Sequence, residues 1–136
     1  MNEYSLMLHT EGIAGLLMEA CKKRRDELEP IERDVLAAYL FGALNAYLQS
    51  KDIDDGDVEH MLLLTSLQRM IGYSKADAYD IIDYLTLCID EEFDPAFKAL
   101  IDKGVAAYAY LNDMEELSRV LRNDMEIVKN AIEDKE

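Results

Sequence analysis

Carboxylates at helical spacing are the residues of this chain that could do chemistry. Asp77, Asp80 and Asp83 recur every third residue, and Glu29 and Glu32 form an earlier pair with the same spacing. Carboxylate oxygens are preferred ligands of Mg²⁺, and a helix brings residues three apart onto neighbouring positions of one surface. The spacing therefore admits a divalent-cation site between helices, provided that the two acidic groups meet in the fold.

Two further patterns are weaker candidates for a metal. Asp57 and His60 have the i, i+3 spacing that lets one helix offer two ligands, but a di-iron bundle needs a second such pair, which the sequence lacks. The acidic residues before Gly56 superficially match a calcium loop. Placing Gly56 sixth in that loop puts Lys51 first and Leu62 twelfth, where carboxylates are required. We therefore predict no metal site and no cofactor.

Negative charge is concentrated in the middle of the chain. The 136 residues include 14 basic and 29 acidic side chains, a net charge of -15, and residues 51–94 carry -9 of it from twelve acids and three bases. Such a field repels phosphates, so we expect no nucleic-acid partner. Clustered like charges destabilise a fold modestly, which favours a functional role for them, such as binding a basic partner.

One expected helix combines this charge with tyrosine. Asp77, Asp80 and Tyr84 share one side of it, Asp83 lies adjacent, and Tyr73 stands just upstream. In protein interfaces aromatic anchors supply buried area and charged groups steer the encounter. The pattern therefore predicts an interface with a basic protein. The alternative is a solvated face that only keeps the chain soluble.

Apolar residues recur with a period near 3.6 through nearly the whole chain, without any stretch of strand alternation. We predict an all-α, single-domain bundle, residues 1–136, of five to six mostly antiparallel helices. A helix at about 31–49 is apolar on every side and should be central. Its Gly42 lowers helix propensity, which a closely packed neighbouring helix would explain.

Capping and turn residues predict where the helices begin. The expected starts are, in chain order, Thr10, Pro30, Asp54 or Asp55, Ser74, Asp94 with Pro95, and Asn112 with Glu115. The basic run at residues 22–25 is expected in the last turn of the first helix, where exposed carbonyls favour cations. Gly72 should close the third helix. Ile89 is expected to point inward on the fourth helix, and the fifth and sixth helices include the apolar residues Val105 and Ile132.

No targeting or membrane segment is expected. No basic residue precedes Lys22, so the amino terminus lacks the charged region of a secretory signal, and we expect a cytoplasmic protein without a membrane partner. The longest uncharged stretch, 35–50, falls short of the ~20 apolar residues that cross a bilayer. Cys21 and Cys88 lie far apart on apolar stripes and should be reduced core residues.

Two segments of this acidic helical chain carry a family resemblance. They are the uncharged stretch Tyr39–Leu44 and the run from Asp94 and Pro95 to Tyr108. With them, roughly residues 30–111 resemble the small all-helical immunity proteins that bacteria keep in their cytoplasm against toxins of contact-dependent or secreted systems. The resemblance implies a non-catalytic protein that binds a cognate toxin and blocks its active site or a required movement.

The resemblance also suggests which surfaces bind the toxin. The candidate residues are those of the acidic helix face, an acidic corner after it and a later polar group: Tyr73, Asp77, Asp80, Asp83, Tyr84, Asp90, Glu91, Glu92, Asp94, Tyr110, Asn112 and Asp113. No catalytic, cofactor-binding or metal-binding residue is assigned.

Two other functions remain open from the sequence. One is a helical adaptor or homodimeric regulator, in which Tyr39, Phe41 and Tyr47 complete a core shared between subunits. The other is an enzyme, because the two acidic groups resemble the paired motifs of all-α magnesium-dependent nucleotide pyrophosphohydrolases. The chain lacks the glutamate cluster of those enzymes, so the immunity function is the leading hypothesis.

Overall fold

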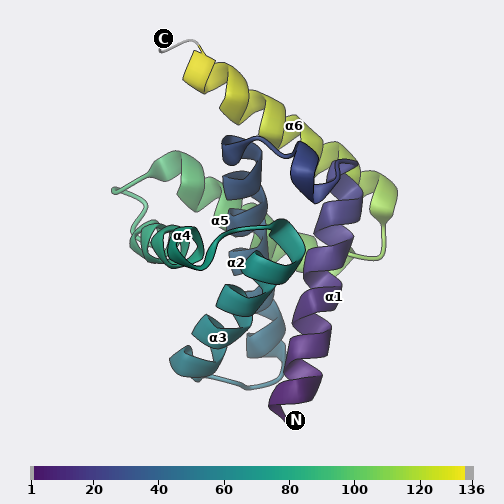
Figure 1. Ribbon diagram of the computed structural model, residues 1–136, viewed down its shortest axis with the longest axis vertical. Helices are drawn as coiled ribbons and strands as arrows, with labels where there is room; N and C mark the ends of the chain where they lie inside the picture. The colour runs from purple at the N-terminus through teal and green to yellow at the C-terminus, as the bar shows by residue number, and fades with distance from the viewer. Residues whose placement is uncertain (1, 134–136) are drawn as a thin grey trace.

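Six α-helices dominate residues 2–133, the part of the chain that the computed structural model describes (Figure 1). In chain order they are α1 (Glu3–Cys21), α2 (Pro30–Ser50), α3 (Gly56–Ser66), α4 (Lys75–Leu87), α5 (Pro95–Ala107) and α6 (Met114–Glu133). No strand occurs within this part. The predicted all-α class is therefore confirmed. The predicted domain range, 1–136, also includes residues 1 and 134–136, which lie outside the described residues.

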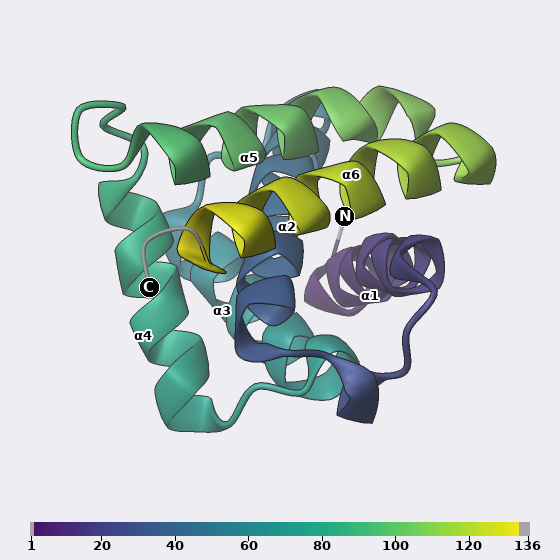
Figure 2. The same ribbon diagram turned by 90° about the horizontal axis from the view of Figure 1, so that it is seen from above.

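Helix α2 is the centre of the bundle, as predicted, because its buried residues point to every side. In Figure 1 α2 runs downward, whereas α1 and α3 beside it run upward. Figure 2 shows α5 and α6 running in opposite directions. Helix α4 departs from this antiparallel arrangement, since Figure 1 shows it nearly end-on. Within the described residues, no helix combines the length and apolar character that crossing a bilayer requires.

Helices α2 and α5 cross so closely that each needs a glycine at the crossing. A Cβ added to Gly42 would clash with the Ile101 carbonyl and lie 2.8 Å from the Val105 nitrogen. A Cβ added to Gly104 would clash with the Tyr39 carbonyl and lie 2.8 Å from the Tyr39 Cα. These neighbours are backbone atoms of a packed helix, which cannot rotate away as a side chain could. The close neighbour expected from Gly42 is therefore α5.

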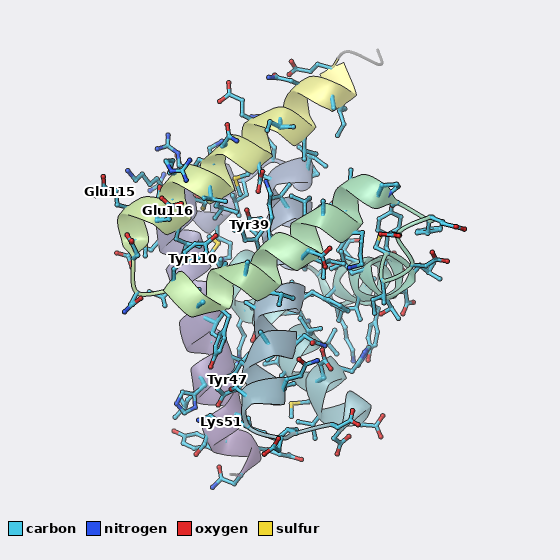
Figure 3. All side chains as sticks on the ribbon, turned by 180° about the vertical axis from the view of Figure 1, so that it is seen from behind. Tyr39, Tyr47, Lys51, Tyr110, Glu115 and Glu116 are labelled. Carbon is cyan, nitrogen blue, oxygen red and sulfur yellow. The ribbon has the colours of Figure 1, made fainter. Side chains whose placement is uncertain are left out.

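A buried polar network ties α2, α5 and α6 together beside this crossing. Tyr39, which is fully buried, donates a hydrogen bond to Asp124, and Lys103 Nζ lies 2.5 Å from the second oxygen of the same carboxylate. Burial, together with the Asp124 carboxylate, raises the pKa of Tyr39, so its hydroxyl remains a donor. Figure 3 shows Tyr39 between the ribbons of α5 and α6. Buried charge is costly unless paired, and Asp124 is paired on both sides.

The aromatic residues of α2 belong to the core of a single chain. Tyr39, Phe41 and Tyr47 are at most 7% exposed. One chain alone therefore completes the core that the homodimeric alternative shared between subunits.

Four of the predicted helix starts are confirmed. Pro30 occupies the first turn of α2, and the side chains of Asp55, Ser74 and Asp94 accept backbone N–H groups at the starts of α3, α4 and α5. Gly72 ends the third helical segment in the left-handed region at φ 96°, after a π-helical turn, Leu67–Ile71. Such a turn places the chain where only glycine is free of strain.

Three predicted boundary features are wrong. Helix α1 begins at Glu3 instead of near Thr10, because the Asn2 side chain caps it by accepting the Ser5 N–H at 2.8 Å. It also ends at Cys21, so the basic run 22–25 follows the helix instead of forming its last turn. At α6 the capping side chain is Asp113, which accepts the Glu116 N–H at 3.2 Å, instead of Asn112.

One residue predicted to point inward, Ile89, is exposed, and so are two apolar residues of the later helices. Ile89, Val105 and Ile132 are 55%, 43% and 42% exposed, respectively. Ile89 follows the end of α4, so the helical period that predicted its burial no longer applies there. Cys21 and Cys88 are both buried and free, as predicted.

The glycine crossing predicts opposite effects for the same substitution at different glycines. Gly42→Ala and Gly104→Ala should each lower the free energy of unfolding by at least about 2 kcal/mol, because the added methyl overpacks the crossing. Gly12→Ala should raise it by up to about 1 kcal/mol, since no atom lies within 4 Å of the added Cβ and alanine favours the helix. Urea denaturation followed by circular dichroism measures all three. Equal tolerance at the three sites would contradict the close crossing.

Candidate protein-binding surface

Helix α4 presents an acidic face because its buried apolar residues lie on the opposite side. Ala78, Ile81, Ile82 and Leu85 are buried, and the three aspartates Asp77, Asp80 and Asp83 are exposed. Ser74 starts the helix by accepting the Asp77 N–H at 3.1 Å, and a negative side chain in this first turn is favoured by the helix dipole. Local sequence thus fixes both the start of α4 and the direction of its acids.

A shallow groove of about 340 Å³ separates this face from the first turns of α2. It brings together several of the predicted residues with others from α2, and is lined by Pro30, Arg33, Asp34, Tyr73, Asp77, Asp80, Ile81 and Tyr84. The groove is lined by one cation, the guanidinium of Arg33, and by three carboxylates, those of Asp34, Asp77 and Asp80. The groove therefore has the chemistry to receive a cationic side chain.

Tyr73 forms part of the wall of the groove and is mostly buried. Its side chain is only 9% exposed, and its hydroxyl donates to Asp34 Oδ1 at 2.7 Å. Burial raises the pKa of Asp34, and the Tyr73 hydrogen bond opposes that rise in part. Burial and the neighbouring Asp34 charge raise the pKa of Tyr73 in turn. Tyr73 therefore positions Asp34 and offers a partner only a small area of its own.

Tyr84 joins the acidic face of α4 to the acidic corner between α4 and α5. Its hydroxyl donates to Asp94, which also starts α5 by accepting the Phe97 N–H at 3.1 Å. Its ring packs edge-on against Phe93 and Phe97, with centroids 5.5 and 5.7 Å away. The hydrogen bond to Asp94 is the main reason that the pKa of Tyr84 rises to about 12. The two predicted surfaces are thus parts of one continuous surface.

No acid of this surface forms an ion pair within the part of the chain that the structure describes. Among the described residues, every acid in an ion pair lies outside 51–94, and these acids are Glu11, Asp26, Glu27, Glu29, Glu32, Asp102, Glu116 and Asp124. Asp77, Asp80, Asp83, Asp90, Glu91 and Glu92 are exposed and have no such pair within 4.0 Å. Their charge is therefore not neutralised by a neighbouring cation of the described chain.

The structure does not bring Tyr110, Asn112 and Asp113 to this surface. They follow α5, whose 13 residues span about 20 Å and whose other end carries Asp94. Figure 3 shows Tyr110 at the turn into α6, near Glu115 and Glu116. Asp113 is occupied as the cap of α6. The acids near the start of α3 are not among the residues that line the groove.

Three large apolar side chains at the corner were missed by sequence reasoning. Leu87, Ile89 and Phe93 are 56%, 55% and 50% exposed. Helical periodicity assigns such residues to a core by default. Pro95 and the acids before it mark the end of a helix, and this was the available signal that the pattern stops applying near residue 88.

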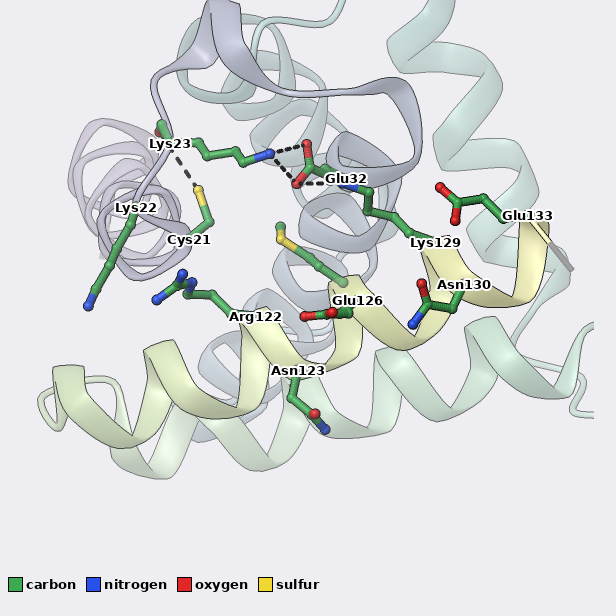
Figure 4. A pocket seen from close by; sticks show the side chains of 11 residues that line it. Cys21, Lys22, Lys23, Glu32, Arg122, Asn123, Glu126, Lys129, Asn130 and Glu133 are labelled. Atoms are coloured by element: carbon green, nitrogen blue, oxygen red, sulfur yellow. Dashed lines mark hydrogen bonds and ion pairs between the residues drawn. The ribbon is translucent and has the colours of Figure 1, made fainter.

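A cavity of about 560 Å³ lies away from this surface, between the end of α1, the start of α2 and α6 (Figure 4). Glu32 lies in it, 2.7 Å from Lys23 Nζ and 3.9 Å from Lys129 Nζ, and accepts the Glu29 N–H at 2.9 Å. Burial raises the pKa of the Cys21 thiol in the same cavity, which favours the unreactive protonated form. These contacts explain part of the basic run after α1, because Lys23 pairs with the buried Glu32 carboxylate.

The two acidic groups that a magnesium site would require do not converge. Glu29 and Glu32 pair with Lys129 and Lys23 near α6, whereas Asp77 and Asp80 line the groove beside α4. Over residues 2–133, no three His, Cys, Asp or Glu side chains are grouped so that they could hold a metal ion.

Comparison with models of known protein families gives a match. The family model described as immunity protein 48 matches residues 13–132. No curated protein and no solved structure shows significant similarity to the chain.

The Tyr84–Asp94 hydrogen bond can be tested by titration. In Asp94→Asn the helix cap is retained, because asparagine caps as well as aspartate, but the carboxylate is lost. The pKa of Tyr84 should fall from about 12 toward its ordinary value of 10.0. NMR of ring-labelled tyrosine measures this, with Tyr84→Phe to assign the signal. Asp90→Asn is the control and should leave the titration unchanged. A value near 10 in the unsubstituted protein would contradict the bond.

The buried Glu32 predicts a pH-dependent loss of stability. Burial alone would raise its pKa, but the bonds from Lys23 and the Glu29 N–H, with the Lys129 charge, outweigh burial and hold it below 4.5. Stability from this charge is therefore present above pH 4.5 and lost as the pH falls through the lower folded-state pKa. Glu32→Gln should cost about 1–2 kcal/mol at pH 7, and the difference should shrink below pH 4.5.

Urea denaturation at pH 7 and 3.5 measures this difference. The exposed Glu126→Gln in the same cavity is the control, with an expected change below about 0.5 kcal/mol at both pH values. A pH-independent effect of Glu32→Gln would show that its packing matters and its charge does not.

Proposed function

The chain belongs to the immunity protein 48 family, and from this premise we propose that it neutralises a cognate bacterial toxin through the acidic surface of α4 and the α4–α5 corner. Membership of an immunity protein family implies toxin neutralisation and a toxin partner, and such families are generally non-enzymatic. We place the protein in the bacterial cytoplasm, acting without a cofactor, a nucleic acid or a membrane. The choice of surface is our inference from the charges described above.

The observation that carries this choice is the gathering of exposed acids on one face of α4 and at the adjoining corner, where none of them has an ion-pair partner among the described residues. A charge already paired within the protein has little field left for a partner, whereas an unpaired cluster attracts a basic surface over about a Debye length, ~8 Å at physiological salt. Steering of this kind raises association rates by ~10 to 10³-fold. Fast capture suits an inhibitor that must bind its toxin before damage occurs.

The groove beside α4 supplies a specific place for a basic side chain of the toxin. Asp77 and Asp80 are exposed at its edge, and Asp34 is held in its wall by Tyr73. Carboxylates so arranged substitute for the anionic substrate that a basic toxin cleft would bind. Tyr84, at 36% exposure, presents an aromatic edge next to them. We expect a toxin lysine or arginine to enter this groove.

Co-expression tests the function itself. The toxin domain encoded next to this chain should arrest growth when expressed alone, and co-expression of this protein should restore growth. Continued arrest, with both proteins soluble, would contradict the proposed function.

Charge reversal tests the surface. Asp80→Lys with Glu91→Lys and Glu92→Lys should slow association with the purified toxin domain at least about 10-fold at low salt and flatten its salt dependence. The control combines Glu19→Lys, Asp54→Lys and Glu126→Lys, which change the net charge equally at exposed positions elsewhere. Stopped-flow kinetics should show a much smaller effect for the control. Equal effects of the two variants would mean that only overall charge matters.

A further inference from the structure

The α4–α5 corner exposes more apolar area than its place in a charged region explains. Leu87, Ile89 and Phe93 are each at least 50% exposed, although they lie within seven residues of one another. Between Leu87 and Ile89, Cys88 is fully buried. The small apolar side chain of this segment therefore points inward, whereas the three large ones are exposed. Single exposed apolar residues need no explanation, but large exposed apolar residues grouped together and rimmed by polar ones are typical of an interaction site. We call these three residues the apolar corner.

Acids surround the apolar corner. Asp90, Glu91 and Glu92 lie between Ile89 and Phe93 in the sequence, all three are exposed, and Asp83 stands one turn before Leu87 on α4. An apolar centre with a polar rim is the usual anatomy of a protein interface. In such an interface a few central residues supply most of the binding free energy, and the rim excludes water and steers.

The corner is held in shape by its own backbone. The Cys88 N–H donates to the Tyr84 carbonyl at 3.0 Å, Asp90 N–H to Leu87 at 3.2 Å, and Phe93 N–H to Asp90 at 3.0 Å. The Asp90 side chain also accepts the Glu92 N–H at 3.0 Å. A loop ordered before binding loses little conformational entropy when it binds, so its apolar area contributes more fully to affinity.

Phe93 is fixed further by the site already described. Its ring packs against Tyr84, which Asp94 holds in place by a hydrogen bond. The apolar corner and the acidic face of α4 therefore share one rigid support.

We infer that the apolar corner is the anchor of the toxin complex, seated in an apolar depression of the toxin that is rimmed by lysine and arginine. This inference rests on the proposed function and adds which residues hold the complex together once charge has brought the partners into contact. The acids then govern mainly the association rate, and Leu87, Ile89 and Phe93 govern mainly the dissociation rate.

Charge complementarity selects a basic partner over a second copy of this chain. In a symmetric dimer the same patch meets itself. Asp90, Glu91 and Glu92 would then face their own equivalents, and among the described residues none of them has a cation within ion-pair distance to offset the repulsion. A basic rim on the partner removes this repulsion and gains attraction.

The test uses the full-length protein and the purified, catalytically inactivated toxin domain encoded beside it. Leu87→Ala with Ile89→Ala should raise the dissociation rate about 30-fold or more while association and its salt dependence stay within twofold of the unsubstituted protein. The control, Leu8→Ala with Ile127→Ala, removes residues of matching exposure, 53% and 56%, and should leave both rates unchanged. An unchanged dissociation rate in the corner variant overturns the inference.

A second measurement needs no substitution. Hydrogen exchange of the unsubstituted complex should show slower exchange at residues 87–93 than in the free protein, and no change there overturns the inference even where the variant fails to fold. Sedimentation of the free protein should show a monomer; a dimer that the corner variant abolishes would assign the corner to a second copy and overturn it as well. Failure of the unsubstituted protein to bind the toxin domain would instead refute the proposed function.

Discussion

The close crossing of α2 and α5 is the constraint on which the rest of the structure depends. At Gly42 and Gly104 the two backbones approach until no side chain fits between them. This contact fixes α5 against the most buried helix of the bundle, and α5 begins at the Asp94 cap that also holds Tyr84. The position of the corner relative to α4 therefore follows from the packing of two helices, and a partner meets a surface whose parts are already in register.

Buried acids and exposed acids are stabilised in two different ways in this structure. The buried carboxylates, Glu32 and Asp124, each have a lysine and a further hydrogen-bond donor, which is what the cost of burying a charge demands. The exposed acids of α4 and the corner have water instead. Some of the few basic side chains therefore pair with buried acids. The net charge of -15 consequently lies mainly on the exposed surface.

Much of the fold could be predicted from the sequence because its signals are local. Pro30, Asp55, Ser74 and Asp94 each mark a helix start through the orphan N–H groups of the first turn, and the central place of α2 follows from apolar residues on all its sides. The helix that packs against Gly42 was not predictable, because a glycine indicates a close neighbour but does not indicate which helix that neighbour is. Nor was the exposure of Ile89, since periodicity holds only while the helix lasts. The acids of the site could be recognised from the sequence composition. The contacts by which Tyr84 joins two groups of these acids could not, because they depend on the path of the chain after α4.

A bundle of short helices has a physical reason to place its binding surface at a corner. Along α4 the buried residues interrupt the exposed ones, so that after the first turn no more than two consecutive residues point outward. A tight link between two helices places consecutive residues outward instead, as Ile89 to Glu92 show, and so concentrates apolar and charged groups in a small area. Such a link is usually mobile, and its binding then loses entropy. Here the turn hydrogen bonds and the packing of Phe93 on Tyr84 limit that loss, because the rigid crossing of α2 and α5 sets where the link must end.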